Sequence, residues 1–496
     1  MISRRLALLA VTALALAAAC SSNSADTGGP PAPLVRGEAG LHARIGSQGK
    51  ISHVIVIIQE NRSFEDFFAG YPGANAPMSG CGVPTPTPQA SALPLAQTSP
   101  KPMTSPSSCP SGDIAIPLHS VNWHDEPDGG HDWSSSLIDW NNGNMDGWTQ
   151  SGMKRGQWRA YAYQDRTEVK PYWTMAQQYV LADEMFPTEF GGSFTGHLTL
   201  VAGTDDIQLP GRAEVDFPSH APDDCDSPPG TKSSYVSAEP YRKKHQWRGG
   251  YPCFTQFNTI AEVLDSAGIS WKIYATKLIG AGFWEPFEAV AYVRCASYSP
   301  STGCVGYGSD WNKDVSAPQT NVLLDAKNGS LSSVSWVTPS GVDSDHPTYH
   351  KPFGPSWVSS VVNAIGESQY WSSSAIIVVW DDWGGSYDNA SPPQLDYRGL
   401  GIRVPCLIIS PYAKQGYVSH VQYEWGSILR FIEETYGLPA GSIGATPLGY
   451  TDGRATSLDD AFNFSQSPRP FKPIHAPYPM SHFLHEPRSD APVDTE

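Results

Sequence analysis

Oxygen-bearing side chains that suit a divalent cation follow two strongly apolar runs of the sequence. Glu60 and Asn61 directly follow one run, and the pair Asp381-Asp382 directly follows another. Adjacent carboxylates repel each other unless a proton or a cation separates them. Glutamate, asparagine and aspartate oxygens are ligands that Mg²⁺, Mn²⁺ and Ca²⁺ prefer. The residue types therefore predict a metal site; from spacing alone, a helix cap at Glu60 and a turn at the aspartate pair remain the alternative.

A serine in a glycine-rich setting is the candidate nucleophile. Ser193 follows Gly191 and Gly192, and such a serine can sit on a tight turn with little around its hydroxyl. Thr195 stands where the esterase pattern Gly-x-Ser-x-Gly requires glycine, so an esterase of that kind is disfavoured. A turn without a catalytic role is the competing interpretation.

Three loop histidines are candidates for contact with a phosphate or for protonation of a leaving group. His131 follows Gly129-Gly130, His346 follows Asp345, and His420 follows a short apolar stretch. An imidazole can donate a hydrogen bond or a proton near neutral pH. A single loop histidine is more often only solvated, so each carries weight only if the fold brings it to the cluster of carboxylates.

The apolar runs are the elements that must position these side chains. They are short, continuous and rich in β-branched residues, which is typical of strands buried on both faces of a parallel sheet. The runs are 54–58, 271–274, 333–337, 375–380 and 404–409. Since ligands bind beyond the carboxyl ends of such strands, polar residues placed directly after them are favoured as site residues.

Helix patterns alternate with the strands. Apolar residues recur with helical period at 260–264, 358–365 and 428–432, and glycines at 268 and 437 suit the ends of the first and last. The alternation predicts an α/β fold with a mostly parallel sheet and helices on both faces. The Pro-, Ser- and Gly-rich stretches near 71–118 and 205–250 are predicted to be long loop insertions, closed by disulfides.

Composition narrows the class of partner. The chain of 496 residues has a net charge of −17, and no basic run offsets it. Broad binding to nucleic acid or to anionic lipid needs a basic surface, so a polyanionic macromolecule is disfavoured. A single phosphate group could still bind at a local site.

The N-terminus predicts export. Arg4 and Arg5 precede an apolar run over 6–19, which is short for a membrane span and ends in small residues at Cys20. Residues 1–20 are predicted to be a signal peptide of lipoprotein type, with Cys20 lipidated and attached to a membrane, and 21–48 a flexible tether. An ordinary cleaved signal is the alternative, and the choice between the general and the twin-arginine export route stays open.

Cysteine usage agrees with an oxidising compartment. Six cysteines lie in loops and fall into sequential neighbours, which suggests three loop-closing disulfides. The predicted pairs are Cys81 with Cys109, Cys225 with Cys253, and Cys295 with Cys304. Cys406 lies in an apolar run and is predicted to be a buried thiol.

A series of motifs follows in order along roughly residues 50 to 475. Its members are 53–64 (HVIVIIQENRSF), 131–133 (HDW), 140–147 (WNNGNMDG), 181–186 (LADEMF), 191–193 (GGS), 345–347 (DHP), 380–388 (WDDWGGSYD), 409–414 (ISPYAK), 462–466 (FNFSQ) and 468–471 (PRPF). The series resembles the bacterial phosphoesterase family that includes non-haemolytic phospholipase C and an acid phosphatase branch. The resemblance implies a phosphoesterase domain over 49–475, followed by a C-terminal tail over 476–496.

The resemblance also implies a fold and a set of roles. The fold would be alkaline-phosphatase-like, and the cofactor a divalent cation such as Mg²⁺, Mn²⁺, Ca²⁺ or Zn²⁺. Ser193 would be the metal-activated nucleophile, and His346 and His131 would contact the phosphate or the leaving group. The metal ligands would be Glu60, Asn61, Asp381 and Asp382. The substrate would be a small phosphate ester or a phospholipid headgroup.

Three positions depart from the family pattern. Glu65 stands where the family commonly has aspartate, and Asn389 where it often has histidine. The Gly-Gly-Ser193 form resembles the acid phosphatase branch more than the Gly-Pro-Thr of the phospholipases, which favours phosphomonoesters without excluding lipids. Hydrolysis of a sulfate ester on the same fold, or an envelope-anchored binding protein without catalysis, are the competing hypotheses.

Overall fold

The computed structural model describes most of the chain beyond the predicted tether. The described residues are 49–84, 109–125, 128–151, 158–207, 213–218, 224–228, 230–237, 245–246, 252–278, 280, 282–396, 398–444 and 450–485. The predicted signal peptide with Cys20, the tether, and parts of both predicted insertions lie outside these residues.

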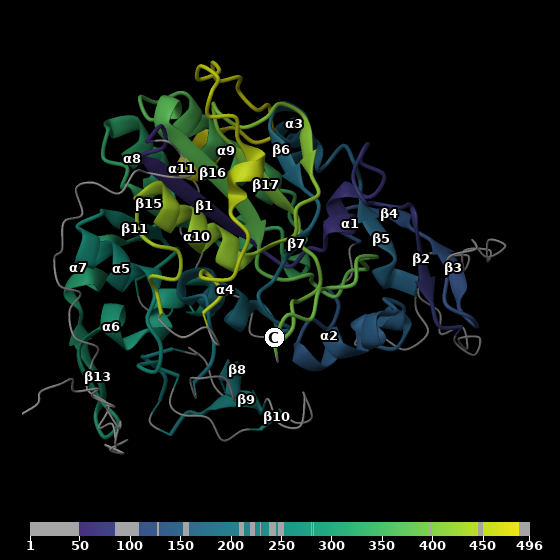
Figure 1. Ribbon diagram of the computed structural model, residues 1–496, viewed down its shortest axis with the longest axis horizontal. Coiled ribbons are helices and arrows are strands. Elements are labelled where there is room, and N and C mark those ends of the chain that lie inside the picture. The colour runs from purple at the N-terminus through teal and green to yellow at the C-terminus, as the bar shows by residue number, and fades with distance from the viewer. Residues whose placement is uncertain are drawn as a thin grey trace, which may run out of the picture. The chain divides into compact units, whose positions relative to one another are not determined.

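An eight-stranded sheet forms the centre of the described part of the chain (Figure 1). Its spatial order is β14-β11-β15-β1-β16-β17-β6-β18, and all neighbours are parallel except β17, which runs antiparallel to β16 and to β6. The strands are β1 (His53–Gln59), β6 (Val180–Ala182), β11 (Trp271–Tyr274), β14 (Val315–Ser316), β15 (Val334–Val337), β16 (Ser374–Trp380), β17 (Cys406–Ile409) and β18 (Tyr417–Ser419). All five runs predicted to be strands belong to this sheet.

Helices cover both sides of the sheet. Figure 1 shows α3, α8, α9 and α11 on one side and α4, α5 and α10 on the other. The helices are α1 (Phe64–Phe68), α2 (Trp133–Trp140), α3 (Lys170–Gln178), α4 (Ser193–Ala202), α5 (Ile260–Ala267), α6 (Ala291–Arg294), α7 (Ser309–Asp314), α8 (Asn321–Asn328), α9 (Gly354–Gly366), α10 (Trp425–Thr435) and α11 (Met480–His485). The expected α/β fold, with a mostly parallel sheet between helices, is confirmed.

The two central strands explain the strength of the sequence signal. Every residue of β16 is buried, as is every residue of β1 after His53. Burial on both faces removes the alternation of polar and apolar residues that a half-exposed strand would show.

The helices match their predicted ends as well: Gly268 closes α5 in the left-handed conformation, and Gly437 follows α10 with a φ of 72°.

Smaller sheets lie outside the centre. Their strands are β2 (Ser79–Gly82), β3 (Ile114–Pro117), β4 (His119–Val121), β5 (Ala162–Gln164), β7 (Met185–Phe186), β8 (Ala213–Pro218), β9 (Ser233–Ser237), β10 (His245–Gln246), β12 (Cys295–Ser299), β13 (Gly303–Tyr307) and β19 (Tyr423–Glu424). The three predicted disulfides are all present, two of them closing sequence separations of 28 residues and one of 9. Cys406 is a buried free thiol, as predicted.

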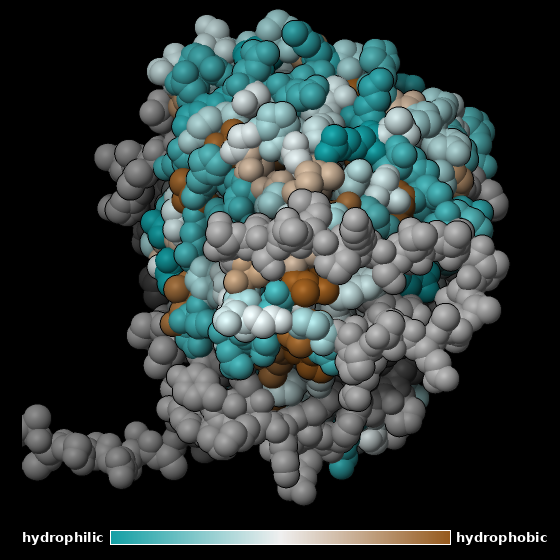
Figure 2. Space-filling model, turned by 90° about the vertical axis from the view of Figure 1, so that its right-hand side faces the viewer, coloured by the Kyte–Doolittle hydropathy of each residue, from teal (hydrophilic) through white to brown (hydrophobic). Residues whose placement is uncertain are grey.

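The described part of the predicted C-terminal tail packs on the domain. Phe483 of α11 is 2% exposed and lies edge-to-face against Trp357 of α9. None of the helices in the described residues is long and apolar enough to span a membrane. On the face drawn in Figure 2, hydrophobic residues lie in small groups among hydrophilic ones.

Candidate active site

The register of the two central strands brings the predicted ligands together. β1 and β16 are parallel, and Gln59 pairs with Trp380 at their carboxyl ends, so the next residues of both strands leave the same edge side by side. The backbone amide of Asn61 donates to Asp381 Oδ1 at 2.8 Å. Glu60, Asn61, Asp381 and Asp382 are all at most 1% exposed. Together with Ser193 we call these residues the strand-end cluster.

A tight approach of two backbones fixes the cluster. Asn61 has a left-handed φ of 53°, and the amide of Arg62 donates to the carbonyl of Asp382 at 2.9 Å. Gly384 has a φ of 61°, and a Cβ placed there would lie 2.1 Å from the carbonyl oxygen of Asn61. The glycine after the aspartate pair is therefore required by this approach, and no ordinary side chain would fit.

Ser193 lies at the start of a helix, whereas the sequence suggested a tight turn. It is the first residue of α4, and Gly192 precedes it in an extended conformation. The reason for glycine here is space: a Cβ at Gly191 would lie 2.2 Å from the Thr195 hydroxyl. The hydroxyl of Ser193 is buried and donates to Asp382 Oδ2 at 2.9 Å. The side-chain Nδ2 of Asn61 donates to the hydroxyl oxygen of Ser193 at 3.4 Å.

The next turn of α4 contributes a residue that the sequence analysis did not select. A Cβ at Gly196 would lie 2.6 Å from the carbonyl oxygen of Asp381, so glycine lets the helix meet the strand end. His197 is four residues after Ser193 and therefore on the same face of the helix. Its Nε2 lies 2.8 Å from Glu60 Oε1 and 3.6 Å from Asp381 Oδ2. The signal that could have identified it is this spacing from the serine.

Burial governs the charge of His197. Loss of hydration lowers the pKa of its imidazole to about 4, against the opposing effect of Asp381. The ring is therefore neutral near pH 7 and brings no positive charge to the neighbouring carboxylates. One ligand atom each from Glu60, His197 and Asp381 lie within 4.8 Å of one another, a spacing that one metal ion can span.

The donor set fits a hard cation. Asn61 Oδ1 is buried and has no hydrogen-bond partner among the described residues, because the amide nitrogen of this side chain makes the contacts. Asp381 makes no ion pair with lysine or arginine in the described part of the chain. A buried oxygen without a donor costs free energy that a cation would recover. Carboxylate and amide oxygens with one imidazole suit Mg²⁺, Mn²⁺, Ca²⁺ or Zn²⁺.

The two predicted histidines lie beside the cluster. His131 Nδ1 lies 2.6 Å from the carbonyl of Gly129, and its Nε2 lies 2.7 Å from Asn61 Nδ2. These contacts assign a neutral ring that donates through Nδ1 and accepts through Nε2. The ring centroids of His131 and His346 are 6.0 Å apart. One ligand atom each from Asp128, His131 and His346 also lie within 4.8 Å of one another.

The loop that carries His346 is tied to the first strand. Gln59 Oε1 accepts from the amide of Asp345 at 3.0 Å, and the guanidinium of Arg62 donates to the carbonyl of that aspartate. The Tyr172 hydroxyl donates to Asp345 Oδ2 at 2.6 Å. Burial raises the pKa of Asp345 to about 7, although these donors oppose the shift. In the motif Asp345-His346, the buried Asp345 fixes the loop, and His346 is the candidate catalytic side chain.

A tryptophan that the sequence analysis did not select lies beside both His197 and His346, two histidines of the candidate site. Trp284 is 2% exposed and ends the short helix η4 (Gly282–Trp284). Its ring is nearly parallel to that of His197, with centroids 6.3 Å apart, and its centroid lies 6.2 Å from that of His346. No periodicity or motif marks this residue, because it comes from a short 3₁₀ helix between irregular segments.

Two further residues singled out from the sequence lie apart from the cluster. His420 is an exposed side chain whose Nδ1 contacts Asp183 at 3.0 Å. Glu65, which stands where the family commonly has aspartate, is buried beside the Asp388–Arg403 ion pair. Burial, and then the charge of Asp388, raise its pKa well above the usual range. Glu65 therefore belongs to the packing beneath the site.

Comparison with known proteins gives one family and a consistent set of relatives. The model of the Phosphoesterase family matches residues 51–439. Phospholipase C B of Mycobacterium tuberculosis is 24% identical over 491 residues, which cover 89% of this chain and 83% of that protein. Non-hemolytic phospholipase C of Pseudomonas aeruginosa is 25% identical, with 88% of this chain and 60% of that protein covered.

Solved structures match at lower similarity. A protein of the alkaline phosphatase superfamily from Vibrio parahaemolyticus has a TM-score of 0.33 and 14% identity, with 69% of this chain and 72% of that chain covered. A phosphonate monoester hydrolase from Silicibacter pomeroyi has a TM-score of 0.30 and 11% identity, with 58% and 73% covered.

Proposed function

The chain belongs to the Phosphoesterase family and is a phosphoester hydrolase, and from that premise we propose that it works through Ser193 as a nucleophile beside one divalent cation. The observation that carries the proposal is the contact of the buried Ser193 hydroxyl with Asp382 at 2.9 Å. It lies among oxygen ligands supplied by the ends of two parallel strands. A nucleophile and its activating groups must be held at this range for in-line attack.

The ligands of the cation would be Glu60, Asn61, Asp381 and Asp382, with His197 as a fifth group in reach of two of them. When bound, the cation would lower the pKa of the serine hydroxyl and neutralise charge on the phosphoryl oxygens. Asp382 accepts the hydrogen bond of the Ser193 hydroxyl and so orients a lone pair of the serine oxygen toward the substrate.

The reaction then divides into two steps. The Ser193 oxygen forms a bond to phosphorus while its proton passes to Asp382, the ester bond to the leaving alkoxide breaks, and a phosphoserine results. His346 supplies the proton that the alkoxide takes up, since its Nδ1 accepts from the amide of Thr348 and its Nε2 can carry the hydrogen. His131 holds Asn61 through its Nε2. Water hydrolyses the phosphoserine in the second step and releases phosphate and the free serine. Most of the barrier is lowered by positioning and by charge stabilisation.

For the substrate we propose an ester with a phosphate headgroup, either a phosphomonoester or a phospholipid. The names of the relatives, phospholipase C in each case quoted, favour a phospholipid. The Gly-Gly-Ser193 form favours a phosphomonoester. Export fits the three disulfides, which persist in oxidising compartments. Attachment to a membrane through lipidated Cys20 is part of the same proposal.

A turnover panel tests the proposal. Aryl phosphomonoesters, aryl phosphodiesters, phosphatidylcholine and aryl sulfates are offered to the purified protein with and without chelator. Hydrolysis of a phosphate ester that chelation abolishes and added metal restores is the expected result. Turnover of sulfates alone would contradict it, and tight binding without any turnover under every metal would indicate a binding protein.

A further inference from the structure

A second group of carboxylates lies outside the strand-end cluster, in the region closed by disulfides. It consists of Asp224, Asp226 and Glu288, and we call it the insertion cluster. One oxygen from each residue lies within 4.8 Å of the others. Oxygen ligands of Ca²⁺ lie about 2.4 Å from the ion, so two of them can be up to about 4.8 Å apart. The spacing is therefore that of ligands around one ion.

Two carboxylates of the insertion cluster lie away from water. Asp224 and Glu288 are both fully buried. Arg294 forms an ion pair with Asp226, with Nη2 at 2.5 and 2.6 Å from its two oxygens. The amide of Gly280 donates to Glu288 Oε1 at 2.8 Å. Buried carboxylates at this spacing repel each other unless a proton or a cation separates them.

Buried oxygens without partners point to a missing ligand. Asp224 Oδ1 accepts from the amide of Asp226 at 2.6 Å, but Asp224 Oδ2 has no hydrogen-bond partner among the described residues. Glu285 is 1% exposed, and neither of its carboxylate oxygens has such a partner. After burial, the charge of Glu288 is the next cause that raises the pKa of Glu285, which places this fourth carboxylate close to the cluster.

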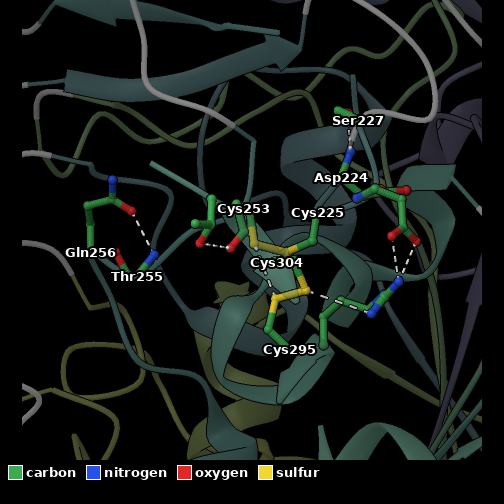
Figure 3. The surroundings of a disulfide bond; sticks show 12 residues. Asp224, Cys225, Ser227, Cys253, Thr255, Gln256, Cys295 and Cys304 are labelled. Carbon is green, nitrogen blue, oxygen red and sulfur yellow. Dashed lines mark hydrogen bonds and ion pairs between the residues drawn. A yellow bond between two sulfur atoms is a disulfide. The ribbon is translucent and has the colours of Figure 1, made fainter. Parts of the chain in front are cut away.

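Covalent bonds make the insertion cluster rigid. Cys225 stands between the two aspartates and is bonded to Cys253, and its amide donates to the carbonyl of Glu288 at 3.0 Å. The neighbouring Cys295–Cys304 disulfide packs on this one, with Cys253 Sγ and Cys295 Sγ 3.7 Å apart (Figure 3). Ligands held in place before binding lose little entropy when the ion arrives.

We propose that Asp224, Asp226 and Glu288 bind one hard divalent cation of the Ca²⁺ type, at a site separate from the catalytic one. The side chain of Asp226 is 28% exposed and gives the ion a route from solvent. Glu288 lies on the short helix η5 (Pro286–Ala289), which begins two residues after Trp284. The cation thus joins the insertion to the segment that holds Trp284 against His197 and His346.

Another acidic group lacks these features and serves as the control. Asp265, Asp310 and Asp314 also have oxygens within 4.8 Å of one another. However, Asp265 and Asp310 are partly exposed, and Lys313 pairs with Asp314 at 3.1 Å. Water and the lysine already stabilise these charges, so this group should bind no cation tightly.

The test counts bound Ca²⁺ by native mass spectrometry and by calorimetry. The double variant Asp224→Asn/Glu288→Gln should bind one ion fewer than the wild type, and Asp310→Asn should bind as many. Asp381→Asn/Asp382→Asn should retain one ion. Equal counts for the wild type and the folded Asp224→Asn/Glu288→Gln protein would overturn the proposal.

A second measurement covers the case in which the double variant does not fold. Ca²⁺ should raise the melting temperature of the Asp381→Asn/Asp382→Asn protein, and absence of both binding and stabilisation there would also overturn the proposal. The count of ions does not depend on turnover. A protein that binds Ca²⁺ at the insertion cluster but hydrolyses no phosphate ester would refute the proposed function and leave this site intact.

Discussion

Two groups of buried carboxylates in this molecule are built by different means. In the strand-end cluster, the parallel register of β1 and β16 places Asn61 beside Asp381, and helix α4 adds Ser193. The insertion cluster has no strand beneath it. Two stacked disulfides and the backbone bond from Cys225 to Glu288 hold it in place.

The surroundings of the two groups differ in charge. The neutral imidazole of His197 lies 2.8 Å from Glu60 and 3.6 Å from Asp381, whereas a guanidinium pairs with Asp226. The strand-end cluster also contains a hydroxyl that can attack a substrate, and the insertion cluster does not. In the two proposals, similar carboxylate spacing serves catalysis at the strand-end cluster and binding of a structural cation at the insertion cluster.

Loss of the nucleophile should have the largest effect on turnover. In Ser193→Ala we expect kcat to fall by roughly 10³-fold or more, because no other group can form the covalent intermediate. Steady-state kinetics on an aryl phosphate measures it. Ser359→Ala is the control, since this buried serine of α9 only donates to the carbonyl of Pro355 and should leave kcat unchanged. Retained activity in Ser193→Ala would refute the nucleophile assignment.

Carboxylate neutralisation separates the two groups directly. Asp381→Asn should lower turnover by roughly 10²-fold or more and weaken binding of the activating cation, because one charged ligand that holds and positions the cation is lost. Asp224→Asn should change turnover by less than about threefold at saturating metal, since it lies outside the catalytic centre. Metal-activation curves for both variants check this. Equal losses would mean that the two groups act as one site.

The close approach of helix α4 to β16 can be broken by one methyl group. Gly196→Ala places a Cβ 2.6 Å from the carbonyl oxygen of Asp381. Overpacking costs about 1–3 kcal/mol, and displacement of Ser193 should lower turnover by roughly 10- to 100-fold. In Gly426→Ala the new Cβ lies equally close to the carbonyl oxygen of Thr451. That variant should lose similar stability in urea unfolding and keep its turnover per folded molecule.

Removal of disulfides should affect the insertion cluster first. Replacement of Cys225 and Cys253 by serine should lower the free energy of unfolding by about 2–4 kcal/mol and abolish Ca²⁺ binding at that cluster. The Cys295–Cys304 bridge closes 9 residues instead of 28, so its loss should cost about 1 kcal/mol less. Denaturant unfolding measures both. A larger loss for the shorter bridge would show that packing, and not chain entropy, dominates.

The smallest effect is expected at the segment that links the two groups. Trp284→Phe keeps an aromatic ring against His197 and His346, and removes an indole N–H that has no partner among the described residues. A lost hydrogen bond to substrate would lower kcat/KM by roughly two- to tenfold. Trp357→Phe removes a similar unpartnered N–H from α9 and should leave kcat/KM unchanged. Identical kinetics for both variants would remove Trp284 from the site.

Much of the centre of the molecule could be predicted from the sequence. Strands such as β1 and β16 can be recognised in the sequence, because burial on both faces requires a continuous apolar run. The strand-end cluster follows from that prediction, since residues directly after parallel strands share one edge of the sheet. The disulfides were also predictable, because each pair joins neighbouring cysteines in loops.

The sequence by itself determined which side chains leave the strand ends, because local hydrophobicity fixes the strands and their limits. Only the tertiary structure decided that Ser193 begins a helix, and that His197 reaches Glu60 one turn later. It alone joined Asp224 to Glu288 and placed Trp284 beside His197 and His346. These contacts join segments far apart in the chain through irregular backbone, and no local periodicity encodes where such backbone goes.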